Sequence, residues 1–491
     1  MSSPTSLITR PSPASRELAP ILALAVLGIV VAVATAAAGP LAVLPIFGVL
    51  FFILVFARPE YGIALFLSTF LMSYPAALQG SGYLTINNVM GGLFGILLMY
   101  KLYSEGDAWF IRRREILLMG FITLICYLGA ALNGPDPRKL SLLSSGGAVY
   151  TAENLRTFFN RAAFTIFFIA FIRKPSHVRM IYMLGLAFML YTSLTGVQGV
   201  LAGGGLKGYR AYTGATDLVA GQAGIIRSAG NPNRLAMFAI LAIAGLWYYM
   251  QTMRRPALRV VIVPLLVMLA LAVFMTASRS GLLGLGTCAA AILIDEGIDL
   301  RKMLTVTLMS LMLVVVVFQF VPEKSLERIT NLPGTQAGET GEGSGSLENR
   351  AYTWGLAIDL FQHNPILGVG MGNWQLFRFL NDPSHAAGSP HSSYLLTLVE
   401  GGILGLGGFL ALLWCTWRNF RYAERQLPYA GYELARLSWI LRSAKASFIV
   451  LVFFSLFADL WQLVILFWLV GLSIVIRRLI EQSADAEALA A

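Results

Sequence analysis

Charged residues are scarce in this chain: only 12% of its 491 residues are Asp, Glu, Lys or Arg. A soluble domain carries about 25% charged residues, so the chain lacks the polar surface that a water-exposed fold needs. Apolar residues make up 57% instead, and the mean hydropathy is +0.71. Because apolar stretches long enough to cross a bilayer recur, the sequence predicts an all-α polytopic membrane protein with about 12–14 transmembrane helices.

Cysteine is also rare. The three cysteines, Cys126, Cys288 and Cys415, all fall inside apolar runs. Their number is odd and no CxxC pair occurs, which argues against a disulfide framework and against a thiolate metal site.

Histidine could supply a metal site instead, because several histidines and aspartates fall in the same long loop. They are His363, His385, His391, Asp359 and Asp382. Their spacing matches no standard zinc signature. We therefore expect neither a metal nor another cofactor.

The net charge of +11 does not indicate nucleic acid, because the basic residues alternate with apolar spans rather than clustering on one domain. Cytoplasmic loops are enriched in Lys and Arg. Short basic loops such as IRRRE at 111–115 and TMRRPALR at 252–259 therefore predict a cytoplasmic N-terminus. The predicted spans are 19–38, 41–57, 61–78, 87–103, 115–132, 158–172, 180–201, 234–250, 259–276, 280–295, 303–321, 392–415, 446–459 and 461–477.

This topology divides the chain into regions and leaves one large outer loop at 322–391. Its weakest point is the boundary at Asp459, because residues 446–478 could form one long helix or two short ones. In the outer loop, LENRAYTWGLAIDLFQ predicts an amphipathic helix and HNPILGVGMGNW a turn. The regions are a cytoplasmic tail at 1–18, an N-terminal transmembrane region at 19–225, a core at 226–415, a cytoplasmic basic loop at 416–445, and C-terminal helices with a tail at 446–491.

His391 is the first candidate for chemistry, because it precedes the span at 392–415. A neutral imidazole can take a proton from a hydroxyl near neutral pH. The adjoining helix N-terminus disfavours the imidazolium form. The alternative is a histidine that only caps the helix or lies at the membrane interface.

Glu400 lies inside the same span, where an ionisable residue is costly and hence a functional candidate. It is roughly 13 Å further along the helix than His391, too far for direct pairing. We expect it to pair with a donor from another span. It is either a buried anchor for the helix or a residue that tunes the site.

Basic residues accompany His391 on the predicted outer side. Arg279 in TASRSG, Arg350 in SLENRAYTW and Arg227 in IIRSAGNPNR carry guanidinium groups that match phosphate oxygens. The alternatives are an interfacial arginine for Arg279 and an exposed ion pair for Arg350. Asn231 and Asn233 are candidates to cap the following helix. Together the set fits a pyrophosphate-bearing substrate at the membrane surface.

Five motifs in this order resemble the O-antigen ligase and O-antigen polymerase superfamily. They are GNPNRLA (230–236), TASRSG (276–281), ENRAYTW (348–354), HNPILGVGMGN (363–373) and PHSSYLLTLVEGGILGLGGF (390–409). The resemblance covers about residues 225–410. One departure is Trp354, which stands where ligases often have leucine.

The resemblance implies a GT-C-like, metal-independent membrane glycosyltransferase of the bacterial inner membrane, with its active site facing the periplasm. Its donor would be an undecaprenyl-pyrophosphate-linked glycan. Its acceptor would be a further glycan for a polymerase or the lipid A core for a ligase. His391 falls on the family's proposed general base, and Arg279 and Arg350 on its pyrophosphate-binding arginines. The resemblance also implies other membrane proteins of polysaccharide assembly as partners.

Two other classes stay open. A transporter or flippase of the same superfamily should have charges deep in several spans and discontinuous helices in paired halves. A non-catalytic membrane scaffold would not need basic residues and a histidine to converge at the outer face.

Overall fold

The structure is a computed structural model that describes residues 52–53, 55–71, 86–106, 108–135, 147–201, 232–297, 344–381, 390–460 and 463–490. The chain forms two compact units, residues 1–62 and 63–491. Several expectations lie outside the described residues. They concern the tail 1–18, the spans 19–38 and 303–321, most of the span 41–57, and residues Arg227, Asn231, Asp382 and His385.

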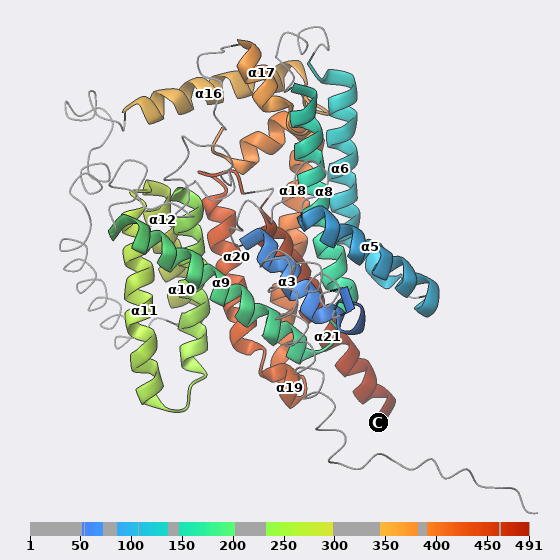
Figure 1. Cartoon of the computed structure of the whole chain (residues 1–491), viewed down its shortest axis with the longest axis vertical. Coiled ribbons are helices and arrows are strands. Elements are labelled where there is room, and N and C mark those ends of the chain that lie inside the picture. Colours follow the sequence, from blue (N-terminus) through green and yellow to red (C-terminus); the bar gives the residue numbers. More distant parts are fainter. Residues whose placement is uncertain are drawn as a thin grey trace, which may run out of the picture. The chain divides into compact units, whose positions relative to one another are not determined.

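The described residues contain helices and no strands (Figure 1). The helices are α3 Pro59–Leu71, α5 Ile86–Glu105, η2 Trp109–Arg112, α6 Arg114–Asn133, α8 Gly147–Phe171, α9 Pro175–Leu201, α10 Pro232–Gln251, α11 Pro256–Met275, α12 Arg279–Glu296, α16 Ser344–His363, α17 Asn373–Asn381, α18 Ser393–Gln426, η5 Leu427–Tyr429, α19 Tyr432–Ala435, α20 Ser438–Phe454 and α21 Val464–Ala490. The fold is that of an all-α polytopic membrane protein, as predicted.

Four helices within the described residues are long and apolar enough to cross a membrane. They are Arg114–Asn133, Pro175–Gln198, Pro232–Gln251 and Ser393–Tyr429. The segment Arg259–Met275 is also apolar but shorter. These ranges overlap five of the predicted spans.

The long helices of the second unit pack in two neighbouring groups. In one group α18 packs against α6 and α21, and α21 packs against α8. In the other α10 packs against α9, α11 and α20, and α20 contacts α12. Small residues permit close helix approach, as expected in a membrane bundle. A Cβ atom added to Gly281 would lie 2.8 Å from the Cβ of Ala236, which joins α12 closely to α10.

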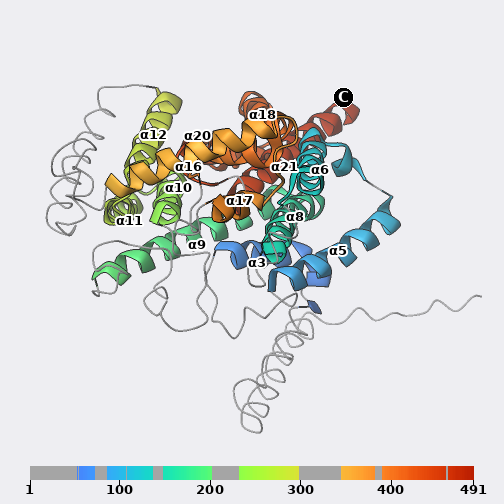
Figure 2. The same ribbon diagram turned by 90° about the horizontal axis from the view of Figure 1, so that it is seen from above.

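The predicted outer-loop helix exists as α16, which lies across the ends of the long helices in Figures 1 and 2. It contacts α18. The break expected near Asp459 is also present, since α20 ends at Phe454 and α21 begins at Val464.

The segment at 416–445 differs from the expected loop because much of it is helical. Helix α18 continues to Gln426, and α20 begins at Ser438. The stretch WRNFRYAERQ contains no glycine or proline, so nothing in it stops the helix before Pro428. At this end Lys445 of α20 pairs with Asp295 of α12 and Glu424 of α18, which ties three helices together.

Candidate functional site

His391 lies in a tightly held turn at the start of α18. Its φ of 51° is in the left-handed region, which is uncommon for a residue other than glycine and recurs at functional sites. The indole Nε1 of Trp354 donates to the carbonyl of Pro390 at 2.8 Å, which fastens this turn to α16. Ser392 caps α18 by accepting a hydrogen bond from the N–H of Leu395 at 3.4 Å.

The segment that follows α20 holds the other side of this turn. The N–H of Ser393 donates to the carbonyl of Ser455 at 2.8 Å, and its hydroxyl donates to the carbonyl of Ala458 at 2.8 Å. Asp459 accepts hydrogen bonds from the backbone N–H groups of His391 and Ser392. Residues 455–459, about 65 positions later in the sequence, therefore fix the position of His391.

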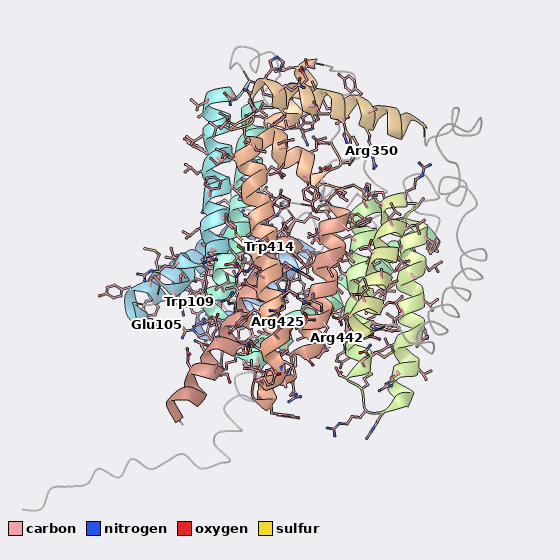
Figure 3. The ribbon with its side chains drawn as sticks, turned by 180° about the vertical axis from the view of Figure 1, so that it is seen from behind. Glu105, Trp109, Arg350, Trp414, Arg425 and Arg442 are labelled. Carbon is pink, nitrogen blue, oxygen red and sulfur yellow. The ribbon has the colours of Figure 1, made fainter. Side chains whose placement is uncertain are left out.

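Two arginines lie near the His391 imidazole. Burial, followed by the positive charges of Arg350 and Arg378, lowers the pKa of His391 to about 4. Arg350 projects from α16 toward the helices beneath it (Figure 3). Arg378 of α17 is only 1% exposed. From the sequence, we expected the helix N-terminus to keep His391 neutral. In the structure, burial and the two arginines lower its pKa instead.

Arg279 is the first residue of α12, next to the start of α10. The hydroxyl of Ser278, the N-cap of α12, donates to Oδ1 of Asn233 at 2.6 Å and accepts from the N–H of Gly281 at 3.0 Å. The motifs GNPNRLA and TASRSG therefore meet in space. Arg234, beside Asn233, interacts electrostatically with Asp459, and this links the start of α10 to the His391 turn.

The glycine-rich motif HNPILGVGMGN forms a turn that inserts into a break in α18. Gly402 interrupts α18 with φ of 61° and ψ of −163°. On one side of the break, the N–H groups of Val369 and Gly370 donate to the carbonyls of Val399 and Glu400, each at 2.9 Å.

On the other side of the break, Ile403 donates to the carbonyl of Pro365 at 2.8 Å. The backbone groups freed by the interruption are therefore paired with the turn. Such pairing is what allows irregular backbone at membrane depth.

Glu400 is buried at the end of the first half of α18, with 3% exposure. Its Oε1 accepts a hydrogen bond from the N–H of Gly372 at 2.8 Å. The expected donor from another span is not the one observed: the donor is the backbone of the glycine-rich turn in the outer loop. This contact agrees with the anchor role, one of the two roles that the sequence left open.

Arg378 and Arg234 were not predicted as site residues from the sequence, and Asp459 was noted only as a helix break. Arg234 and Asp459 fall inside predicted spans, so the cost of a charge in the membrane was the signal that could have identified them. Arg378 had no such signal, because it lies in the outer loop.

No group of three or more metal-ligating side chains occurs within the part of the chain that is described. His363 lies 3.7 Å from Asp359, and both are exposed.

Comparison with known families gives one match. Residues 264–410 match the family described as O-antigen ligase, and this range contains Arg279, Arg350, His391 and Glu400. A search of curated proteins found no match to the chain. This match confirms the resemblance to the O-antigen ligase and polymerase superfamily over residues 264–410, which are similar to the O-antigen ligase family.

Proposed function

We propose that the chain is a glycosyltransferase of the bacterial inner membrane. It transfers a glycan from an undecaprenyl-pyrophosphate-linked donor to an acceptor hydroxyl on the periplasmic side, without a metal. The observation that carries this proposal is a neutral histidine, His391, fixed in a buried turn beside the two cations Arg350 and Arg378. The family match over residues 264–410 supports the same class of reaction.

The proposed reaction is a single displacement at the anomeric carbon. The acceptor oxygen forms a bond to this carbon while the bond to the pyrophosphate oxygen breaks, so the configuration inverts. The unprotonated ring nitrogen of His391 takes the hydroxyl proton. The pyrophosphate leaves with the electron pair of the broken bond, and the proton on His391 later passes to solvent.

The arginines act on the leaving group in this proposal. Negative charge grows on the pyrophosphate as the glycosidic bond breaks, and nearby guanidinium groups stabilise it. Arg350 is in electrostatic range of His391, which puts the proposed base and leaving-group cation in one region. The contact of Ser278 with Asn233 joins the start of α12, where Arg279 lies, to the start of α10.

The transporter alternative is weakened by the break at Gly402. In transporters, an interrupted helix leaves backbone groups open toward a substrate or ion. Here Val369 and Ile403 belong to the backbone pairing that closes the break. The interruption accordingly serves to hold the glycine-rich turn rather than a transported ion.

Both polymerase and ligase activities fit this site, and the acceptor distinguishes them. We would incubate purified protein with an undecaprenyl-pyrophosphate-linked repeat unit alone, and then with lipid A core added. A ladder from the donor alone identifies a polymerase of O-antigen or exopolysaccharide. Product only with lipid A core identifies an O-antigen ligase. No transfer with either acceptor would contradict the proposed function in both forms.

A further inference from the structure

The second half of α18 carries an exposed stripe that changes from apolar to basic. Ile403, Leu410 and Trp414 are 54%, 46% and 61% exposed, and Arg418 and Arg425 are exposed beyond them. These positions are four or seven apart, so they share one face of the helix. In Figure 3, Trp414 lies midway along α18 and Arg425 near its C-terminal end. The stripe therefore places a tryptophan between an apolar surface and arginines, which is the order expected where a helix leaves a bilayer.

Helix α6 carries a matching stripe beside it. Arg114 at the start of α6 is exposed, and Leu117, Phe121 and Leu124 are 58%, 38% and 53% exposed. These positions are three or four apart and also share one face. A Cβ atom added to Gly408 of α18 would lie 3.2 Å from Cδ1 of Phe121, so this face of α6 borders α18. The two helices together present an apolar surface that ends in arginines.

Arg114 and Arg418 lie close together where this surface ends. Their neighbours in the sequence are joined by a hydrogen bond, because Nδ2 of Asn419 donates to Oε1 of Glu115 at 2.7 Å. Both arginines are also within electrostatic range of Cys415, which lies one turn before Asn419 on α18. Each helix therefore contributes one guanidinium group to the same part of the surface.

Among the described residues, neither arginine of this pair forms an ion pair or a side-chain hydrogen bond. The carboxylate of Glu115 is buried and receives the hydrogen bond from Asn419. Arg421 of the same helix differs, because it pairs with Glu424 at 2.7 Å. The two exposed guanidinium groups are therefore available to an anion from outside the protein.

We propose that Arg114 and Arg418 bind the phosphate of an anionic phospholipid whose acyl chains lie along the apolar faces of α6 and α18. Guanidinium groups match phosphate oxygens, and an indole such as that of Trp414 prefers the level of the lipid headgroups. Basic surfaces between membrane helices are a known means of binding anionic headgroups. Because each helix supplies one arginine, the lipid joins α6 to α18 at the end of α18 opposite His391. This lipid site is independent of the proposed transfer reaction.

The test measures the thermal unfolding midpoint of the full-length protein in detergent. Wild type is compared with the double variants Arg114→Gln/Arg418→Gln and Arg114→Lys/Arg418→Lys. The control is Arg254→Gln/Arg255→Gln, which removes two exposed arginines from the loop at 252–259 that is predicted to lie on the same side of the membrane. Each protein is titrated with phosphatidylglycerol, with phosphatidylcholine and with inorganic phosphate.

We expect phosphatidylglycerol to raise the midpoint of wild type more than phosphatidylcholine does, because only the former has a net negative charge. The glutamine variant should match wild type without lipid, since both arginines are exposed. It should lose most of the difference between the two lipids, with binding of phosphatidylglycerol roughly tenfold weaker or more. The lysine variant should keep most of the difference, because it retains the charge. The control should respond as wild type does.

Several results would overturn this lipid site. An equal rise with phosphatidylcholine would show that acyl chains alone bind, and an equal rise with inorganic phosphate would identify a free anion as the ligand. An unchanged response of the glutamine variant would exclude Arg114 and Arg418. An equal loss in the control would show that only the total positive charge matters. High salt screens exposed charges, so a difference between the two lipids that persists in wild type at high salt would contradict the site without any variant.

Discussion

Gly402 of α18 and Gly368 of the preceding turn meet backbone to backbone. A Cβ atom on Gly368 would lie 2.5 Å from the nitrogen of Gly402, and one on Gly402 would lie 2.2 Å from the carbonyl oxygen of Ile366. Both glycines have positive φ, 64° and 61°. The two most specific motifs of the sequence are therefore two halves of one interlocked structure.

Gly402→Ala should disrupt this interlock. The left-handed backbone costs a residue with a side chain on the order of 1–3 kcal/mol, and the clash with Ile366 adds to that cost. We expect a clear fall in the thermal unfolding midpoint and in the yield of folded protein. Gly407→Ala in the same helix is the control, because nothing lies within 4 Å of its added Cβ. Equal stability of the two variants would refute the interlock.

Glu400→Gln separates the two roles considered for this residue. Glutamine keeps an oxygen that can accept from the N–H of Gly372, so an anchor role predicts nearly normal stability and transfer. Glu400→Ala removes the acceptor and should destabilise the protein by about 1–3 kcal/mol. Folded but inactive Glu400→Gln would show instead that the charge itself is needed.

The pH dependence of transfer should report the environment of His391. The base form is the active form, and a lowered pKa preserves that form to lower pH. With the pKa at about 4, kcat/KM should stay level down to about pH 5.5 and fall below it. An ordinary histidine pKa of about 6.5 would leave roughly 10% of the base form at pH 5.5. A fall centred near pH 6.5 would contradict this account.

Donor binding should raise the pKa of His391. The pyrophosphate brings negative charge next to Arg350, which weakens one cause of the lowered pKa of His391. The acid limb of kcat, which reports the substrate complex, should therefore lie at higher pH than that of kcat/KM. Coincident limbs would indicate that the pyrophosphate binds away from His391.

Arg279→Lys should lose most transfer although it keeps the positive charge. An ammonium group cannot reproduce the two parallel hydrogen bonds that a guanidinium makes to phosphate oxygens. The loss should be at least tenfold in kcat/KM, measured with the lipid-linked donor. Arg259→Lys, at an exposed arginine in α11, is the comparison, and its activity should match wild type. Full activity of Arg279→Lys would show that Arg279 does not bind the donor pyrophosphate.

The sequence predicted much of this architecture because membrane helices leave strong signals. Long apolar runs located the long helices of the bundle, and LENRAYTWGLAIDLFQ located α16, whereas α17 and α19 were not predicted. The His391 motif, the glycine-rich turn and Glu400 were also found from sequence. Their roles remain predictions, although the contact between Glu400 and Gly372 now gives one of them a structural basis.

The other features of the site depend on contacts between residues far apart in the sequence, which no local pattern encodes. Asp459 holds the backbone of His391 from 68 positions away, and Arg378 influences it from a short helix with no motif. The break at Gly402 could not be predicted from the run at 392–415 alone, because the break exists only when the turn at 365–372 fills it.

The central claim is that His391 acts as the base in glycan transfer. The most direct measurement compares wild type with His391→Ala for the rate of transfer and, in the same preparations, for the rise in unfolding midpoint caused by undecaprenyl pyrophosphate. The account predicts that the variant folds and binds the lipid pyrophosphate but transfers at least a hundredfold more slowly, as expected on loss of a general base, roughly 10²–10⁴-fold. Transfer at the wild-type rate by the folded variant would contradict it.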